Sequence, residues 1–193
     1  IGLMRRLWTE DRVTHQGRFY SVKDHGISLK PTRPGGPPVW VAGLVEPAVR
    51  RAARIGDAWL IANATTLGAT EPLMKIYREE LANIGKTVEE FPIARECYVG
   101  SSHKTAMEEC RVALEYKYNS YAAWGMESPT ANMTFEEMAR DRFIIGDKVS
   151  VKEEIARWAE TLGCNHFSMR VQWPGLPQER VLGSIRRLGE IYG

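Results

Sequence analysis

The stretch of residues 37–62 constrains the fold more than any other part of the chain. Its sequence, PPVWVAGLVEPAVRRAARIGDAWLIA, holds two short apolar segments separated by a helical pattern, with a glycine at each end of that pattern. This order predicts a strand, a helix and a second strand, which form a βαβ unit with parallel strands. The unit places the loop of residues 43–46 at the carboxyl end of a strand, where α/β proteins bind ligands.

The rest of the chain repeats this alternation. Thr70 is predicted to cap one helix, Ser101 or Ser102 the next, and a capping box from Ser150 to Glu153 a third. A last helix follows the turn at residues 173–175. The sequence therefore predicts four βα units, whose strands lie at residues 39–42, 58–62, 91–99 and 166–172.

Four βα units are half of a (β/α)8 barrel, whereas a doubly wound sheet is the alternative. No GxGxxG motif follows the first strand. In the last strand Phe167 and Met169 share one face, and Ser168 and Arg170 share the other. A strand covered by helices on both faces is apolar on both, so the polar face favours a barrel mouth. We expect one domain, residues 1–193, in which the loop of residues 126–141 is a lid or a connector.

Composition excludes some classes of protein. The chain has 193 residues, 44% hydrophobic and 26% charged, with a formal net charge of +2. This balance gives no argument for binding to nucleic acid or to an anionic membrane, and no apolar run approaches the ~20 residues of a membrane span. The three cysteines are odd in number and have no metal spacing, which predicts reduced thiols in a cytoplasmic protein. The first residue, Ile1, indicates a fragment or a processed chain.

Glu96 and Arg170 are the candidate catalytic residues. If the third and fourth predicted strands are neighbours, both side chains face the same interior and can pair. One interpretation is a structural ion pair. The other is that Arg170 binds an anionic substrate or flavin group, while Glu96 orients it or handles a proton.

Gly43, Leu44 and Val45 are the candidate cofactor contacts. They precede a helix whose free backbone N–H groups could hold a phosphate. The alternative is a tight turn that needs glycine, and Glu46 would oppose a bound anion. Other side chains provide no further candidate site. Three tryptophans are interpreted as core residues, and the four histidines show no ligand spacing, so no metal is expected. These residues are Trp59, Trp124, Trp173, His15, His25, His103 and His166.

Four segments in this order resemble the bacterial luciferase-like, flavin-dependent monooxygenases. They are LMRRLWTEDRVTHQGRFY, PPVWVAGLVEPAVRRAARIGDAWLIA, ARECYVGSSHKTA and RFIIGDKVSVKEEIARWAETLGCNHFSMRVQWPG. The resemblance implies that the chain is the carboxyl-terminal half of a (β/α)8 TIM-type barrel, with strands five to eight. It also implies a cofactor, reduced FMN or F420, at the carboxyl ends of the strands.

The sequence departs from that family at two places. Gly43, Leu44 and Val45 stand where a small or hydroxyl residue commonly lies near the flavin phosphate. Ala94 and Glu96 replace the Arg-x-His pair of alkanesulfonate-type members, which makes a sulfonate substrate doubtful.

The resemblance implies a monooxygenase that uses reduced FMN and O₂ on a small organic substrate. The alternatives are F420-dependent hydride transfer, or a barrel relative that binds flavin without turnover. With FMN, a reductase partner would supply the reduced flavin. We expect a homo-oligomer at full length, and an inactive protein if the half barrel stands alone, because its open strand edges promote self-association.

Overall fold

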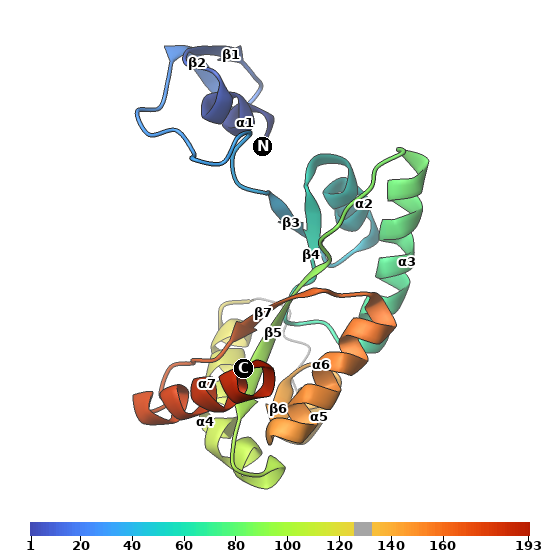
Figure 1. Ribbon diagram of the computed structural model, residues 1–193, viewed down its shortest axis with the longest axis vertical. Coiled ribbons are helices and arrows are strands. Elements are labelled where there is room, and N and C mark those ends of the chain that lie inside the picture. Colours follow the sequence, from blue (N-terminus) through green and yellow to red (C-terminus); the bar gives the residue numbers. More distant parts are fainter. Residues whose placement is uncertain (126–132) are drawn as a thin grey trace.

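The βαβ unit expected from the sequence is present (Figure 1). The computed structural model describes residues 1–125 and 133–193. In it β3 and β4 pair in parallel, and α2 connects them along the chain. A Cβ atom on Gly43 would lie 2.9 Å from the carbonyl carbon of Ala48, so glycine is what allows α2 to begin so close to the end of β3. The elements are β3 (Trp40–Ala42), α2 (Glu46–Ile55) and β4 (Ala58–Leu60).

A second sheet carries the longest strand. It has the order β6-β5-β7 with parallel pairing, and consists of β5 (Pro92–Val99), β6 (Ile144–Gly146) and β7 (His166–Arg170). Just beyond β4, the Ile61 N–H group donates to the Pro92 carbonyl at 3.0 Å, and the Ile61 carbonyl accepts from Ala94 at 2.9 Å. The four predicted strands therefore lie side by side in the order β3-β4-β5-β7.

The strand β6 was not predicted. Its three residues are too few to show a periodic pattern, and it pairs only with the last part of β5, where Cys97 lies opposite Ile144. The Gly100 N–H group then donates to the Gly146 carbonyl at 2.9 Å. Two edges of β5 are therefore in use, one by Ile61 and β6, the other by β7.

Helices cover both faces of β5, and α4 covers the face of Glu96, which was expected from the sequence to be free of helices. On one face Cys97 packs in a cluster with Trp158 of α6, and on the other Tyr98 packs in a cluster with Leu114 of α4. The Ser184 hydroxyl of α7 accepts a hydrogen bond from the Val99 N–H group at 2.8 Å. These helices, with the short α5 before β6, are α3 (Leu67–Asn83), α4 (His103–Ala123), α5 (Phe135–Ala139), α6 (Lys148–Leu162) and α7 (Gln178–Tyr192).

Arg95 interrupts the apolar face of β5 and is nevertheless fully buried. Its guanidinium carbon lies 3.8 Å from the centre of the Trp158 ring, and its Nη1 donates to the Ala62 carbonyl at 2.6 Å. Its Nε and Nη2 atoms have no partner among residues 1–125 and 133–193. Because burial removes water from the charged form, the pKa of Arg95 is lowered to about 9.

The amino-terminal elements form a separate group in the upper part of Figure 1. An antiparallel hairpin follows a short helix, and the Arg5 guanidinium joins this helix to the βαβ unit through Asp57 at 2.8 Å. Lys30 donates to the Leu7 carbonyl at 2.8 Å. The elements are α1 (Gly2–Thr9), β1 (Val13–Gln16) and β2 (Ser21–His25).

Two predicted helix starts were wrong. Thr66, not Thr70, caps α3, because its hydroxyl is placed to accept the Ala69 N–H group at 3.3 Å. The carboxylate of Asp147 caps α6 by accepting the Ser150 N–H group at 2.9 Å, so that helix begins before the expected box. Of the predicted caps of α4, Ser102 is the correct one.

The expected lid falls partly outside the described residues. Residues 126–132 are not described, and the remainder of the loop contains α5, which begins with a true capping box between Thr134 and Glu137. No helix of the described ranges is long and apolar enough to cross a membrane.

Candidate functional site

Glu96 lies at the centre of a buried polar cluster. Its side chain is fully buried on the face of β5 that α4 covers. Asn63 donates to Oε1 at 2.6 Å, and the Lys117 ammonium donates to the same oxygen. The Trp173 indole N–H group donates to Oε2. The carboxylate is therefore held by donors from α4 and from the segments that follow β4 and β7.

Lys117 shares the burial of Glu96 and is 6% exposed. Burial lowers its pKa, against the opposing effect of the Glu96 carboxylate that it binds. Its ammonium also lies 4.8 Å from the Tyr118 ring centre and 5.4 Å from that of Tyr121. The Tyr118 hydroxyl lies 3.4 Å from Glu96 Oε1, and burial raises the pKa of that phenol. The cluster thus fixes both charges in an apolar setting.

Arg170 meets Glu96 as the sequence suggested. The two residues are register partners on β5 and β7, and Arg170 Nη1 lies 3.7 Å from Glu96 Oε1. At that distance the two groups form an ion pair but no hydrogen bond. The Arg170 side chain stays 50% exposed, because the carboxylate is already occupied by Lys117 and Trp173. Its donors therefore remain accessible.

A hollow of about 480 Å³ opens beside Arg170. Its walls come from α4 and from the turn after β7. Trp124 is 72% exposed, so its interpretation as core was wrong, whereas Trp59 and Trp173 are buried as expected. The side chains that matter for its chemistry are Tyr116, Lys117, Tyr121, Trp124, Arg170 and Trp173.

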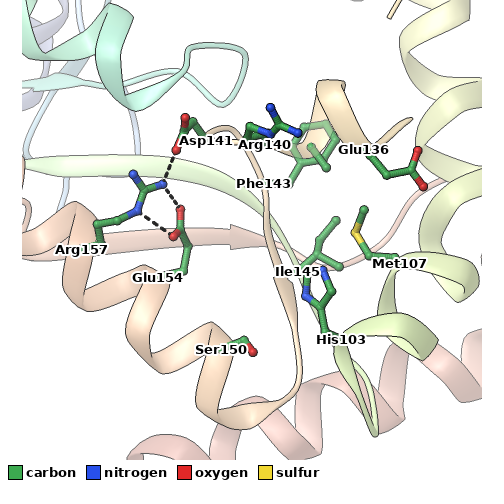
Figure 2. A pocket seen from close by; sticks show the side chains of 11 residues that line it. His103, Met107, Glu136, Arg140, Asp141, Phe143, Ile145, Ser150, Glu154 and Arg157 are labelled. Carbon is green, nitrogen blue, oxygen red and sulfur yellow. Dashed lines mark hydrogen bonds and ion pairs between the residues drawn. The ribbon is translucent and has the colours of Figure 1, made fainter. Parts of the chain in front are cut away.

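Figure 2 shows a second hollow, of about 380 Å³, between α4, α5 and α6. In its wall the Arg157 guanidinium donates to both oxygens of Glu154, at 2.8 and 2.6 Å, and to Asp141 at 2.7 Å. His103 and Met107 line the opposite wall from α4. Its lining holds two guanidinium groups, Arg140 and Arg157, and three carboxylates, which belong to Glu136, Asp141 and Glu154. Because carboxylates outnumber guanidinium groups, this hollow offers less to an anion than the one at Arg170, whose described lining has no acidic residue.

The loop Gly43, Leu44 and Val45 lies at the carboxyl end of β3. The side chains of Leu44 and Val45 are 51% and 60% exposed, whereas Gly43 is buried and its carbonyl accepts from the Trp59 indole at 3.0 Å. Glu46 forms an ion pair with Arg50 at 2.8 Å, which offsets the repulsion that its charge would exert on a bound anion.

The first turn of α2 offers few free donors. The Ala48 and Val49 N–H groups both donate to the Val45 carbonyl at 3.0 Å, and Pro47 has no N–H group. An anion here would be held by the loop before the helix more than by the helix itself.

Sequence reasoning missed Lys117, Asn63 and Trp173 as members of the Glu96 cluster. A signal for Lys117 existed, since the buried residues of α4 recur at helical spacing and Lys117 falls among them: Ala106, Cys110, Ala113, Leu114, Lys117 and Tyr118. Trp173 had none, because a turn residue carries no period. Within residues 1–125 and 133–193, no group of three His, Cys, Asp or Glu side chains is placed to hold a metal ion.

The comparisons with known proteins agree with the fold. Residues 1–166 match the luciferase-like monooxygenase family, and the chain belongs to that family. The fold is that of part of a (β/α)8 barrel, as the sequence indicated. The chain is similar to the F420-dependent glucose-6-phosphate dehydrogenase of Microbacterium testaceum, with 29% identity over 195 residues, 94% of this chain and 55% of that protein.

Two solved structures share the fold. The monooxygenase RslO1 from Streptomyces bottropensis aligns with a TM-score of 0.82 and 19% identity over 99% of this chain and 58% of that one. The oxygenating constituent of 3,6-diketocamphane monooxygenase from Pseudomonas putida, in complex with FMN, aligns with a TM-score of 0.72 and 16% identity over 97% and 59%. The chain thus spans little more than half of the proteins it matches. Among them, the dehydrogenase is F420-dependent and the diketocamphane monooxygenase is in complex with FMN.

Proposed function

We propose that the protein is an F420-dependent oxidoreductase that transfers a hydride to or from a small molecule. The observation that carries this proposal is the 29% identity to an F420-dependent dehydrogenase over 94% of the chain. F420, when bound, supplies the hydride acceptor or donor, and the protein supplies binding, orientation and electrostatics.

The loop of Gly43, Leu44 and Val45 is the proposed binding site for an anionic group of the cofactor. Its support is the exposed loop at the carboxyl end of β3 and the pairing of Glu46 with Arg50. The loop offers no hydroxyl, so its contacts would be backbone N–H groups.

Arg170 is the proposed substrate-binding group, and Glu96 its positioning residue. Glu96 is fully buried and its oxygens accept from Lys117, Asn63 and Trp173, so its side chain is held in one position. The carboxylate attracts the Arg170 guanidinium from 3.7 Å, and no side-chain hydrogen bond of Arg170 is found among residues 1–125 and 133–193. This arrangement would present a cation at a constant position to a substrate.

Titration of the intact protein with F420 and with FMN tests the proposal. We expect F420 to bind with a dissociation constant at least about tenfold lower than that of FMN, a difference of about 1.4 kcal/mol. Fluorescence of each cofactor measures both constants under the same conditions. Tighter binding of FMN would overturn the proposal.

That opposite result would support the second candidate function, an FMN-dependent monooxygenase. The observation that favours it is the fold shared with RslO1, at a TM-score of 0.82. Only in that case would a reductase partner be required. Homo-oligomer formation and a cytoplasmic location remain predictions.

A further inference from the structure

We infer that the hollow beside Arg170 binds a flat aromatic substrate that carries a carboxylate. This inference deepens the proposed function, and rests on it for the statement that the occupant is a substrate. The hollow has about 480 Å³, which is within the size range of small-molecule sites.

The walls of the hollow favour a flat ring. Tyr116 and Trp124 are 61% and 72% exposed, which is unusual for such large aromatic side chains. Trp124 lies 5.9 Å from Tyr121, centre to centre, with their planes tilted by 43°. Trp173 and Pro174 also line the hollow. Aromatic faces of this kind stack on planar groups.

The charge of the hollow favours an anion. Two cations, Lys117 and Arg170, share the single carboxylate of Glu96, which leaves a positive charge at this end of the sheet. Lys117 is buried with its ammonium on Glu96, so the accessible cation is Arg170. Among the described residues that line the hollow, none is acidic. A guanidinium with free parallel donors matches a carboxylate in two hydrogen bonds.

Three probes separate the two features in the intact protein. Benzoate is flat and charged, benzamide is flat and neutral, and cyclohexanecarboxylate is charged and not flat. We expect benzoate to bind at least about tenfold more tightly than either of the others, since each lacks one of the two interactions. Calorimetric titration measures all three.

The variant Arg170→Met tests the cation, and Arg186→Met is its matched control, since Arg186 is an exposed arginine of α7 that does not line the hollow. We expect Arg170→Met to weaken benzoate binding by about tenfold or more and to leave benzamide binding unchanged. Because the Arg170 side chain is half-exposed, we expect the variant to lose little free energy of unfolding. Thermal unfolding of the variant checks this.

The outcomes distinguish this inference from the proposed function. Equal binding of benzoate to the wild type and to Arg170→Met, or equal affinity for cyclohexanecarboxylate, would overturn the inference. So would competition between benzoate and F420, because the hollow would then belong to the cofactor. F420 binding without benzoate binding would leave the proposed function standing and this inference wrong. Benzoate binding without F420 binding would overturn the proposed function, and with it the statement that the occupant is a substrate, and would leave the ligand chemistry of the hollow standing.

Discussion

Replacing Lys117 by methionine is expected to lower the free energy of unfolding by about 3–5 kcal/mol. Lys117 is 6% exposed and Glu96 is fully buried, so the change leaves a carboxylate in the interior without its main counter-charge. Asn63, Trp173 and the more distant Arg170 compensate only in part. Denaturant unfolding of the intact protein measures the loss.

The double variant Lys117→Met with Glu96→Gln is the control. A neutral amide still accepts from the Trp173 indole and carries no charge to bury, so the double variant is expected to recover at least about half of the loss. Losses that simply add would contradict a coupled pair. A loss below about 1 kcal/mol for Lys117→Met alone would show that water reaches the cluster.

Replacing Gly43 by alanine is expected to lower the free energy of unfolding by about 1–3 kcal/mol. The new Cβ would lie 2.9 Å from the backbone carbonyl carbon of Ala48, and a backbone cannot swing aside as a flexible side chain can. Helix α2 must then shift away from β3. This shift also disturbs the hydrogen bond from the Trp59 indole N–H group to the Gly43 carbonyl. Denaturant unfolding measures the change, and F420 affinity should fall in the same variant.

Gly68→Ala is the matched control for that change. Gly68 lies exposed in the first turn of α3, and a Cβ there meets nothing within 4 Å. This substitution should raise stability by about 0.5–1 kcal/mol through the lower backbone entropy of alanine. If Gly43→Ala raises the free energy of unfolding as Gly68→Ala does, α2 does not pack closely against the end of β3.

The parts of the fold that were predictable depend on local patterns. The βαβ unit follows from apolar runs and two glycines within 26 residues, and the pairing of Glu96 with Arg170 follows from a two-residue period on neighbouring strands. The start of α3 was missed because two threonines, Thr66 and Thr70, offer equivalent caps in sequence. Only the backbone geometry of the chain decides which one serves.

The candidate site was less predictable than the fold. Lys117 lies in a helix rich in charged residues, and its burial becomes evident only when the apolar spacing of α4 is followed through it. Trp173 reaches Glu96 from 77 residues away, through a contact that no local pattern encodes. Trp124 was misjudged because size alone was taken to mean burial, whereas it stands 72% exposed beside the hollow.

A crystal structure of the intact protein with F420 tests the central claim most directly. The account predicts an anionic group of F420 within about 3 Å of a backbone N–H group of Gly43, Leu44 or Val45. It also predicts that the hollow beside Arg170 remains open to a second molecule. F420 bound away from the carboxyl end of β3, or filling the hollow itself, would contradict the account.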